Sequence, residues 1–192
     1  QLHESPTDVA AIRMLAEVAA RLGRLDDAET LLARCLELAP GFQAARQNYA
    51  MVLHRANKPE QALEQIDRLL ADEPGNPGAR NLKAVVLCRV GDYLPAIALY
   101  DGILAEYPDH GRIWLSQGHA LKTAGLRERA VAAYRRSIEL DPGFGEAYWS
   151  LANLKTFRFE PADITAMLAQ LTRHDLDAEQ RFPVDVAPAK EI

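Results

Sequence analysis

The chain has 192 residues, of which 48% are hydrophobic and 26% charged, the composition of a folded globular protein. Its net charge of −5 argues against a chain that binds nucleic acid over its whole surface. No run of about 18 or more apolar residues occurs, so no membrane-spanning helix is predicted. The two cysteines, Cys35 and Cys88, lie far apart in the sequence, so we expect no disulfide framework and a reducing, cytoplasmic location.

Three sequence markers recur at an interval of 34 residues. Prolines stand at positions 6, 40, 74, 108 and 142, and alanines at positions 28, 62, 96 and 130. Turn-type residues keep the same interval at Gly23, Asn57, Gly91 and Gly125. Asn57 fits this series because asparagine is the usual substitute for glycine where the backbone needs a positive φ. Three markers in one register indicate an internal repeat.

Each repeat is predicted to form a helix, a turn and a second helix, here named helix A and helix B. Four full repeats are expected at residues 9–42, 43–76, 77–110 and 111–144. Small residues recur where helix A must approach helix B closely: Ala16, Ala50, Ala84 and Gly118. Bulky residues recur on helix B beside them: Leu32, Ile66, Tyr100 and Tyr134. The apolar spacing predicts a core at positions four, seven, eight and eleven of the repeat, including Ile12, Leu15 and Ala16.

These residues resemble the tetratricopeptide repeat, a helix–turn–helix unit with small residues mid-helix and a proline at its end. The resemblance covers about residues 9–144 and implies an all-α fold, a right-handed α-solenoid with a concave groove. One departure concerns position four, which is Ile12 and Trp114 in the outer repeats but Arg46 and Arg80 in the middle ones. We expect the arginine stems to lie along the core while their heads reach water.

Residues 145–173 are predicted to form a divergent fifth unit that caps the solenoid. Phe159 stands where the turn residue belongs, and Pro161 suits the first turn of a second helix. An apolar stripe follows at helical spacing: Ile164, Met167, Leu168 and Leu171. Residues 1–8 are expected to be a lead-in, and residues 174–192, which lack an apolar period, a tail.

A narrower resemblance covers residues 145–167, GEAYWSLANLKTFRFEPADITAM. This stretch is similar to the last repeat before the catalytic domain of bacterial tetratricopeptide-repeat sulfotransferases. The resemblance implies an accessory region beside a sulfonucleotide-dependent domain. The PxSGT-like phosphosulfate-binding loop of that domain does not occur in these 192 residues, so no catalysis is predicted for this chain.

The common catalytic and cofactor motifs do not occur in the sequence. It has no GxxxxGK[ST], GxGxxG, HExxH, GxSxG or CxxC pattern, and its five histidines lack ligand-type spacing. We therefore expect no metal, no cofactor and no enzymatic activity. His54 and His119 are most simply solvated helix residues, Cys35 is expected to be an inert core thiol, and Cys88 falls on the groove side of its helix.

In the tetratricopeptide family, helix A of each repeat lines the groove. Positions two, five, nine, twelve and thirteen would point inward, where six basic residues face only two acidic ones, Glu17 and Glu146. A basic groove in an acidic chain favours an acidic partner segment. The predicted partner-binding residues are Arg13, Arg21, Gln47, Met51, Arg55, Asn81, Val85, Arg89, Arg112, Leu115, His119, Lys122, Trp149 and Asn153.

Several functional hypotheses follow from this pattern. The leading one is a non-catalytic scaffold that binds an acidic peptide or helix of a partner protein, with Met51, Val85, Leu115 and Trp149 as apolar anchors. The competing interpretation of the cations is that Arg21, Arg55 and Arg89 merely complement helix dipoles in the last turns. A second hypothesis is the substrate-presenting arm of a sulfotransferase. A third is association of copies through exposed solenoid ends.

Overall fold

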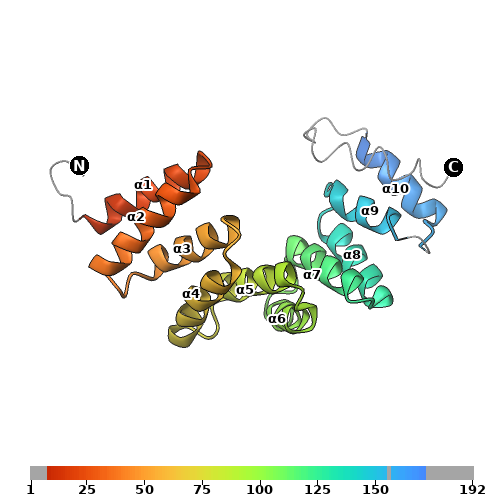
Figure 1. The fold of residues 1–192 in the computed structure, drawn as a ribbon. Coiled ribbons are helices and arrows are strands. Elements are labelled where there is room, and N and C mark those ends of the chain that lie inside the picture. Colours follow the sequence, from red (N-terminus) through yellow and green to blue (C-terminus); the bar gives the residue numbers. More distant parts are fainter. Residues whose placement is uncertain (1–7, 155–156, 172–192) are drawn as a thin grey trace. The chain divides into compact units, whose positions relative to one another are not determined.

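The computed structural model describes residues 8–154 and 157–171 of the chain (Figure 1). Within these residues lie ten helices and no strand, which confirms the predicted all-α class of helix–turn–helix repeats. The predicted lead-in before Asp8 and the predicted tail at 174–192 lie outside the described residues. The chain divides into two compact units, Gln1–Asp92 and Tyr93–Ile192, and each is described by itself.

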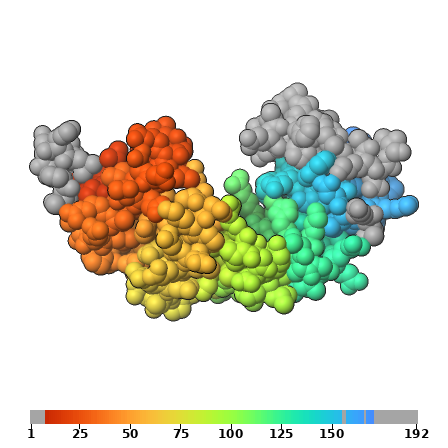
Figure 2. Space-filling model, viewed as in Figure 1, coloured from red at the N-terminus to blue at the C-terminus, as the bar shows by residue number. Residues whose placement is uncertain are grey.

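Five helices make up the described part of the first unit: α1 (Val9–Arg21), α2 (Leu25–Leu38), α3 (Gln43–Arg55), α4 (Pro59–Asp72) and α5 (Pro77–Val90). Each helix packs against the next one along the chain. In the space-filling view, the colours of this unit follow the sequence from red to yellow-green across the surface (Figure 2). In addition, α1 contacts α3 and α3 contacts α5. The A helices of this unit therefore form a row beside the B helices.

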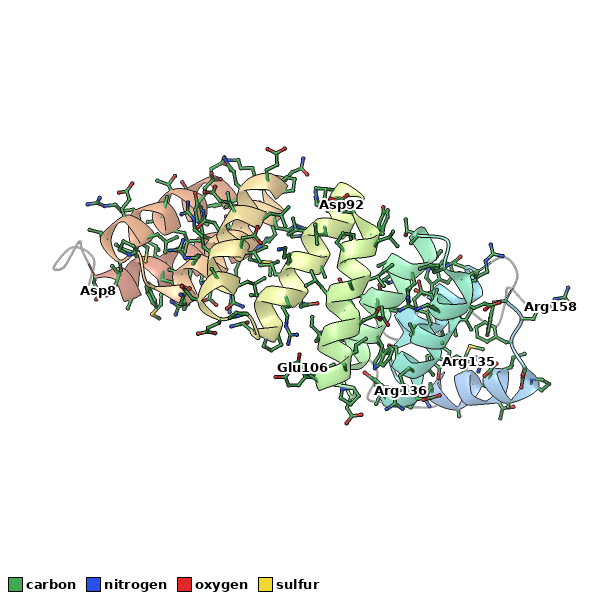
Figure 3. The ribbon with its side chains drawn as sticks, turned by 90° about the horizontal axis from the view of Figure 1, so that it is seen from below. Asp8, Asp92, Glu106, Arg135, Arg136 and Arg158 are labelled. Carbon is green, nitrogen blue, oxygen red and sulfur yellow. The ribbon has the colours of Figure 1, made fainter. Side chains whose placement is uncertain are left out.

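The described part of the second unit contains α6 (Tyr93–Glu106), α7 (Gly111–Thr123), α8 (Arg127–Leu140), α9 (Gly145–Ala152) and α10 (Pro161–Leu171). Consecutive helices from α6 to α9 pack in chain order. An ion pair fastens α10 to α8, because both terminal nitrogens of Arg135 donate to the carboxylate of Asp163, each at 3.2 Å. Arg135 is labelled in Figure 3. The guanidinium of Arg135 also lies 5.3 Å from the ring centroid of Phe157, which meets Phe159 edge-to-face at 5.0 Å.

The four predicted turn residues have the left-handed backbone conformation. Their φ angles are 78° at Gly23, 61° at Asn57, 93° at Gly91 and 79° at Gly125. In each turn the amide of the next residue donates to a carbonyl five residues back, as from Lys58 to Leu53 at 2.9 Å. This bond closes the end of helix A in a Schellman-type cap, for which a positive φ is required. The prediction for Asn57 is confirmed: it is the one non-glycine residue with positive φ among the described residues.

The close helix contacts follow the predicted small and bulky positions. Ala16, Ala50 and Ala84 are fully buried on the A helices, and the bulky B-helix residues are at most 1% exposed. The prediction that Leu15 belongs to the core is wrong, because its side chain is 45% exposed. Position seven faces helix B of the preceding repeat, and no described element precedes α1. Its equivalent in the second repeat, Tyr49, packs against the core cluster of the first.

The arginine and tryptophan side chains at position four of the repeat make the same kind of hydrogen bond. The indole nitrogen of Trp114 donates to the carbonyl of Pro108 at 2.7 Å. Arg46 donates in the same way to the carbonyl of Pro40, and its other terminal nitrogen donates to Oε1 of the buried Gln65 at 2.9 Å. Arg80 donates to the carbonyl of Gly75 at 3.1 Å. Each side chain thus fastens its helix A to the loop that precedes it, which explains how arginine replaces an aromatic residue here.

Candidate partner-binding surfaces

The first unit carries eight of the predicted partner-binding residues, which we call the first-unit surface: Arg13, Arg21, Gln47, Met51, Arg55, Asn81, Val85 and Arg89. All eight lie on the A helices α1, α3 and α5. Most of them are exposed, while Arg13, Asn81 and Val85 are half-buried. The row of A helices presents both cationic and apolar side chains to solvent.

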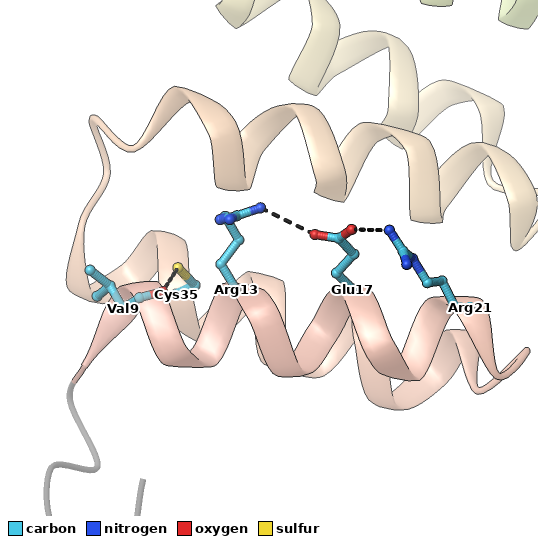
Figure 4. A network of polar contacts seen from close by, with 5 residues as sticks. All are labelled: Val9, Arg13, Glu17, Arg21 and Cys35. Atoms are coloured by element: carbon cyan, nitrogen blue, oxygen red, sulfur yellow. Dashed lines mark hydrogen bonds and ion pairs between the residues drawn. The ribbon is translucent and has the colours of Figure 1, made fainter. Parts of the chain in front are cut away.

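On α1, the two predicted cations share one carboxylate. Nη1 of Arg13 lies 3.4 Å from Oε2 of Glu17, and Nη2 of Arg21 lies 2.7 Å from Oε1 of the same residue (Figure 4). The three residues are spaced four apart, so they stand above one another on one side of the helix. This carboxylate offsets half of the positive charge of the pair and makes α1 the less cationic part of the first-unit surface.

On α5, Arg89 is held by the turn of the preceding repeat. Its Nε and Nη2 donate to Oδ1 of Asn57 at 3.2 and 3.1 Å. Burial lowers the pKa of His54, and the positive charge of Arg89 lowers it further. A neutral His54 beside a fixed guanidinium leaves this corner of the surface with one positive charge at neutral pH.

Between these fixed groups, α3 presents an exposed cation beside an exposed apolar side chain. Met51 is 44% exposed, and Arg55 follows one helical turn later on the same side. None of the described residues forms a hydrogen bond or ion pair with Arg55. Next to them, the amide of Gln47 would lie only 3.3 Å from a Cβ at Gly78, so α3 and α5 approach closely here. Glycine at position 78 leaves room for that amide.

The second unit carries the remaining six predicted residues, which we call the second-unit surface: Arg112, Leu115, His119, Lys122, Trp149 and Asn153. Arg112 and Lys122 are exposed, whereas His119, Trp149 and Asn153 are half-buried. Leu115 is only 5% exposed, so the prediction that it is an apolar anchor open to a partner is wrong. Position five of the repeat lies at the edge of the buried side of helix A. A long polar side chain at this position reaches solvent, but the leucine side chain is covered.

His119 links α7, α8 and α9 within the second unit. Its Nδ1 lies 3.1 Å from the hydroxyl of Tyr134, and its Nε2 lies 3.6 Å from Oε1 of Glu146. Burial lowers the pKa of His119, and the neighbouring carboxylate of Glu146 opposes that change. Burial also raises the pKa of Tyr134 to about 12. His119 is therefore a partly structural residue, in contrast to the fully solvated one that the sequence predicts.

A cleft of about 470 Å³ opens beside the second-unit surface. Lys122 and Asn153 from the predicted set line it together with Gly125, Arg127 and Leu154. Two cationic side chains thus stand at its walls. Sequence reasoning missed Arg127, because it lies in the first turn of helix B and the predicted positions were confined to helix A.

Three further features of the described residues concern metal binding, membrane insertion and thiol reactivity. They contain no group of three or more histidine, cysteine or carboxylate side chains arranged for a metal ion. No helix among them is long and apolar enough to cross a membrane. Cys35 is fully buried, its thiol donates to the carbonyl of Val9 at 3.3 Å, and burial raises its pKa. Burial also raises the pKa of Cys88, which makes either thiol a poor nucleophile.

Comparison with known families supplies the name of the repeat. Three models described as tetratricopeptide repeat match the sequence, over residues 11–44, 30–86 and 111–144. The chain is built from tetratricopeptide repeats. The matched residues make up more than half of the 192, and the markers of the intervening residues keep the same register. No curated protein matches the sequence.

Solved structures of tetratricopeptide-repeat proteins share the fold. A MamA RS-1 double mutant aligns with a TM-score of 0.69 at 16% identity, covering 95% of this chain and 96% of that one. MamA from Desulfovibrio magneticus RS-1 aligns equally well at 15% identity, with coverage of 95% and 92%. YrrB, described as a TPR protein with an unusual peptide-binding site, gives a TM-score of 0.65 at 14% identity, with coverage of 98% and 90%. At such identities the likeness establishes the fold alone.

Proposed function

We propose that this protein is a non-catalytic scaffold that binds a peptide or helix of a partner protein on the A helices of its tetratricopeptide repeats. The observation that carries the proposal is the arrangement on α3, where the exposed Met51 stands one turn from Arg55, which no described residue neutralises. A cation without a partner beside an apolar side chain suits a ligand that offers both a carboxylate and an apolar group. The peptide-binding site named for YrrB lends general support.

The partner segment is acidic and carries apolar anchors. Arg89, held by Asn57, and the exposed Arg55 supply positive charge on neighbouring A helices of the first unit. On the second-unit surface, Arg112 and Lys122 add two more exposed cations beside the half-buried Trp149. Arginine pairs with carboxylates through two parallel hydrogen bonds, which favours acidic side chains at defined positions.

The test begins with peptides selected from a random display library on the intact chain. We expect the enriched peptides to be acidic with spaced apolar residues, and the double substitution Arg55→Glu with Arg89→Glu to weaken their binding at least tenfold, about 1.4 kcal/mol. The matched control is Arg34→Glu with Arg68→Glu, which makes the same change in net charge on the exposed sides of α2 and α4. If both double substitutions weaken peptide binding equally, the protein attracts the peptide through its net charge and not through the first-unit surface.

The competing role of these cations, complementing helix dipoles, makes a different prediction. In that case Arg55→Glu with Arg89→Glu would lower the free energy of unfolding by the modest amount typical of helix ends, about 0.3–1 kcal/mol per residue. Peptide binding would then remain unchanged once the comparison is made at a temperature where both proteins are folded. Isothermal titration with the selected peptides separates the two roles.

We also propose two alternative functions, each with its own test. A substrate-presenting role beside a sulfotransferase domain rests on the sequence likeness of residues 145–167 alone, and reading the gene downstream of the codon for Ile192 tests it. Association of copies through the ends of the repeat stack is tested by light scattering over a range of concentrations. We place the protein in the cytoplasm on its two distant cysteines, a placement that fractionation of cells would test.

A further inference from the structure

The A helices α3 and α5 present the same chemical order along one side. Position five of the repeat carries an amide, position nine an apolar side chain and position thirteen a cation. On α3 these residues are Gln47, Met51 and Arg55, and on α5 they are Asn81, Val85 and Arg89. The three positions are four residues apart, so they follow one another along each helix at intervals of about 6 Å.

The two helices run side by side in the same direction. In their first turns, a Cβ at Gly78 of α5 would lie 3.3 Å from Nε2 of Gln47 on α3. At their other ends, the guanidinium of Arg89 donates to Oδ1 of Asn57, which follows α3. A ligand segment that lies along α3 therefore meets the same order of chemical groups on α5.

Helix α1 does not continue this order. Its residues at the three positions are Arg13, Glu17 and Arg21, and the carboxylate of Glu17 pairs with both arginines. Within the described part of the first unit, the surface with amide, apolar and cationic positions therefore consists of α3 and α5.

The two amides distinguish an extended ligand from a helical one. None of the described residues forms a hydrogen bond with the side chain of Gln47 or Asn81. Asn81 is half-buried, so its amide is partly removed from water. An amide side chain both donates and accepts, which matches the free N–H and C=O groups of an extended main chain. A helix offers few such groups along its sides, because its own hydrogen bonds use them.

The intervals along the surface also fit an extended segment. Successive residues of an extended chain rise by about 3.3 Å, and every second side chain points to the same side. Two residues therefore span about 6.6 Å, close to the interval of about 6 Å between the positions on each helix. A helical ligand matches this interval only with residues four apart, so the two conformations require different ligand sequences.

We propose that the surface of α3 and α5 binds an extended segment of a partner protein and that Gln47 and Asn81 hold its main chain. In this segment, one residue separates an apolar side chain from an acidic one. The inference rests on the peptide-binding function proposed above and adds to it the conformation and the spacing of the ligand. Gln47 and Asn81 select the main chain, whereas Arg55 and Arg89 select the acidic side chain.

The test compares two synthetic peptides of equal net charge with blocked ends. In the first, a single proline separates leucine from glutamate, which an extended chain accepts and a helix interior does not. In the second, leucine and glutamate lie four residues apart in a helix closed by a lactam bridge, because so short a helix is marginal in water. Fluorescence anisotropy with the intact chain measures both dissociation constants. We expect the proline peptide to bind at least tenfold more tightly.

Substitutions in the protein locate the contacts with the main chain. Gln47→Leu and Asn81→Leu each remove one amide without changing the net charge, and each should weaken binding of the proline peptide at least threefold. Gln61→Leu removes an exposed amide from α4 as the matched control, and it should leave binding unchanged. Methylation of single main-chain nitrogens in the peptide should identify a position whose effect is not additive with Gln47→Leu or Asn81→Leu. Such coupling reports a direct contact rather than a change in folding.

The outcomes separate this inference from the proposed function, which the display-selected peptides test. If Arg55→Glu with Arg89→Glu leaves binding of those peptides unchanged, the proposed function fails and this inference fails with it. If that change weakens binding but the helical peptide binds as tightly as the proline peptide, only the extended conformation is wrong. Effects of Gln47→Leu and Asn81→Leu no larger than that of Gln61→Leu would show that the amides do not hold the main chain. No binding of the proline peptide at millimolar concentration would also overturn the inference.

Discussion

A methyl group at position 118 would stand 2.5 Å from Cε1 of Tyr134 and 2.6 Å from its Cδ1. Gly118 lies on α7 and Tyr134 on α8, and the tyrosine ring is fully buried between the helices. The corresponding pair is Ala16 with Leu32 in the first repeat and Ala50 with Ile66 in the second. In the Gly118 pair, the ring of Tyr134 occupies the space that a Cβ at position 118 would need.

This close contact predicts that Gly118→Ala destabilises the protein although alanine favours helices. The overpacking costs about 1–3 kcal/mol, against a gain in helix propensity of about 1 kcal/mol. We expect a net loss of up to about 2 kcal/mol in the free energy of unfolding by urea. Adding Tyr134→Leu, which recreates the Ala16 and Leu32 combination, should recover part of that loss. If the double variant is less stable than the sum of both single changes, the volume argument is wrong.

A second prediction concerns the hydrogen bond between Arg46 and Gln65. Arg46→Met would leave the amide oxygen of Gln65, which is only 8% exposed, without its donor. The expected cost is about 1–3 kcal/mol, the penalty of an unsatisfied buried polar group. Gln65→Leu in addition should reduce that cost, since Leu31 occupies the same position of the first repeat. A double-mutant cycle by thermal unfolding measures the coupling, and additive effects would contradict it.

A third prediction separates backbone strain from the side-chain contact at Asn57. Asn57→Ala should lower the free energy of unfolding by about 1–2 kcal/mol, because alanine resists the φ of 61°. Asn57→Gly should be close to neutral in stability, as glycine fills this position in the other repeats. Both variants release Arg89 from its acceptor, so they should alter peptide binding alike while differing in stability. Equal stability of the two would refute the strain argument.

A fourth prediction follows from the raised pKa of Tyr134, about 12 in the folded protein against 10 ordinarily. Between these values the folded state keeps the phenolic proton that the unfolded state loses. Below pH 10 the hydroxyl of Tyr134 is protonated in both states and does not lower the free energy of unfolding. As pH rises from 10 to about 12, the free energy of unfolding falls by about 3 kcal/mol. Tyr134→Phe should flatten this part of the pH profile in chemical denaturation. A residual slope is expected, because burial also raises the pKa of Tyr49 and Tyr148.

Much of the fold could be predicted from the sequence because its determinants are local and repeated. A turn that needs positive φ selects glycine or asparagine at a fixed position, and close helix packing selects alanine or glycine at another. The markers at Gly23, Ala28 and Pro40 recur every 34 residues, so each repeat tests the prediction made from the others. Those positions therefore predicted the paired helices, the turns and the buried contacts.

The candidate surfaces were predicted less completely. A residue's position in the repeat indicates which side of a helix it occupies, but not which groups its side chain contacts. The i,i+4 spacing allows Glu17 to pair with Arg13 and Arg21, but no spacing rule places Asn57 beside Arg89. The burial of Leu115 depends in the same way on how neighbouring side chains cover the edge of a helix.

By itself, then, the sequence determined the repeat, its helix pairs and the chemical character of the A helices, since these depend on residues a few positions apart. Only the tertiary structure decided which of those side chains remain open. Val18 and Val52 occupy the same position of successive repeats, yet one is 52% and the other 3% exposed. The difference arises because α2 covers this side of α3 while no described helix covers the same side of α1, and burial depends on the neighbour that a residue acquires in space.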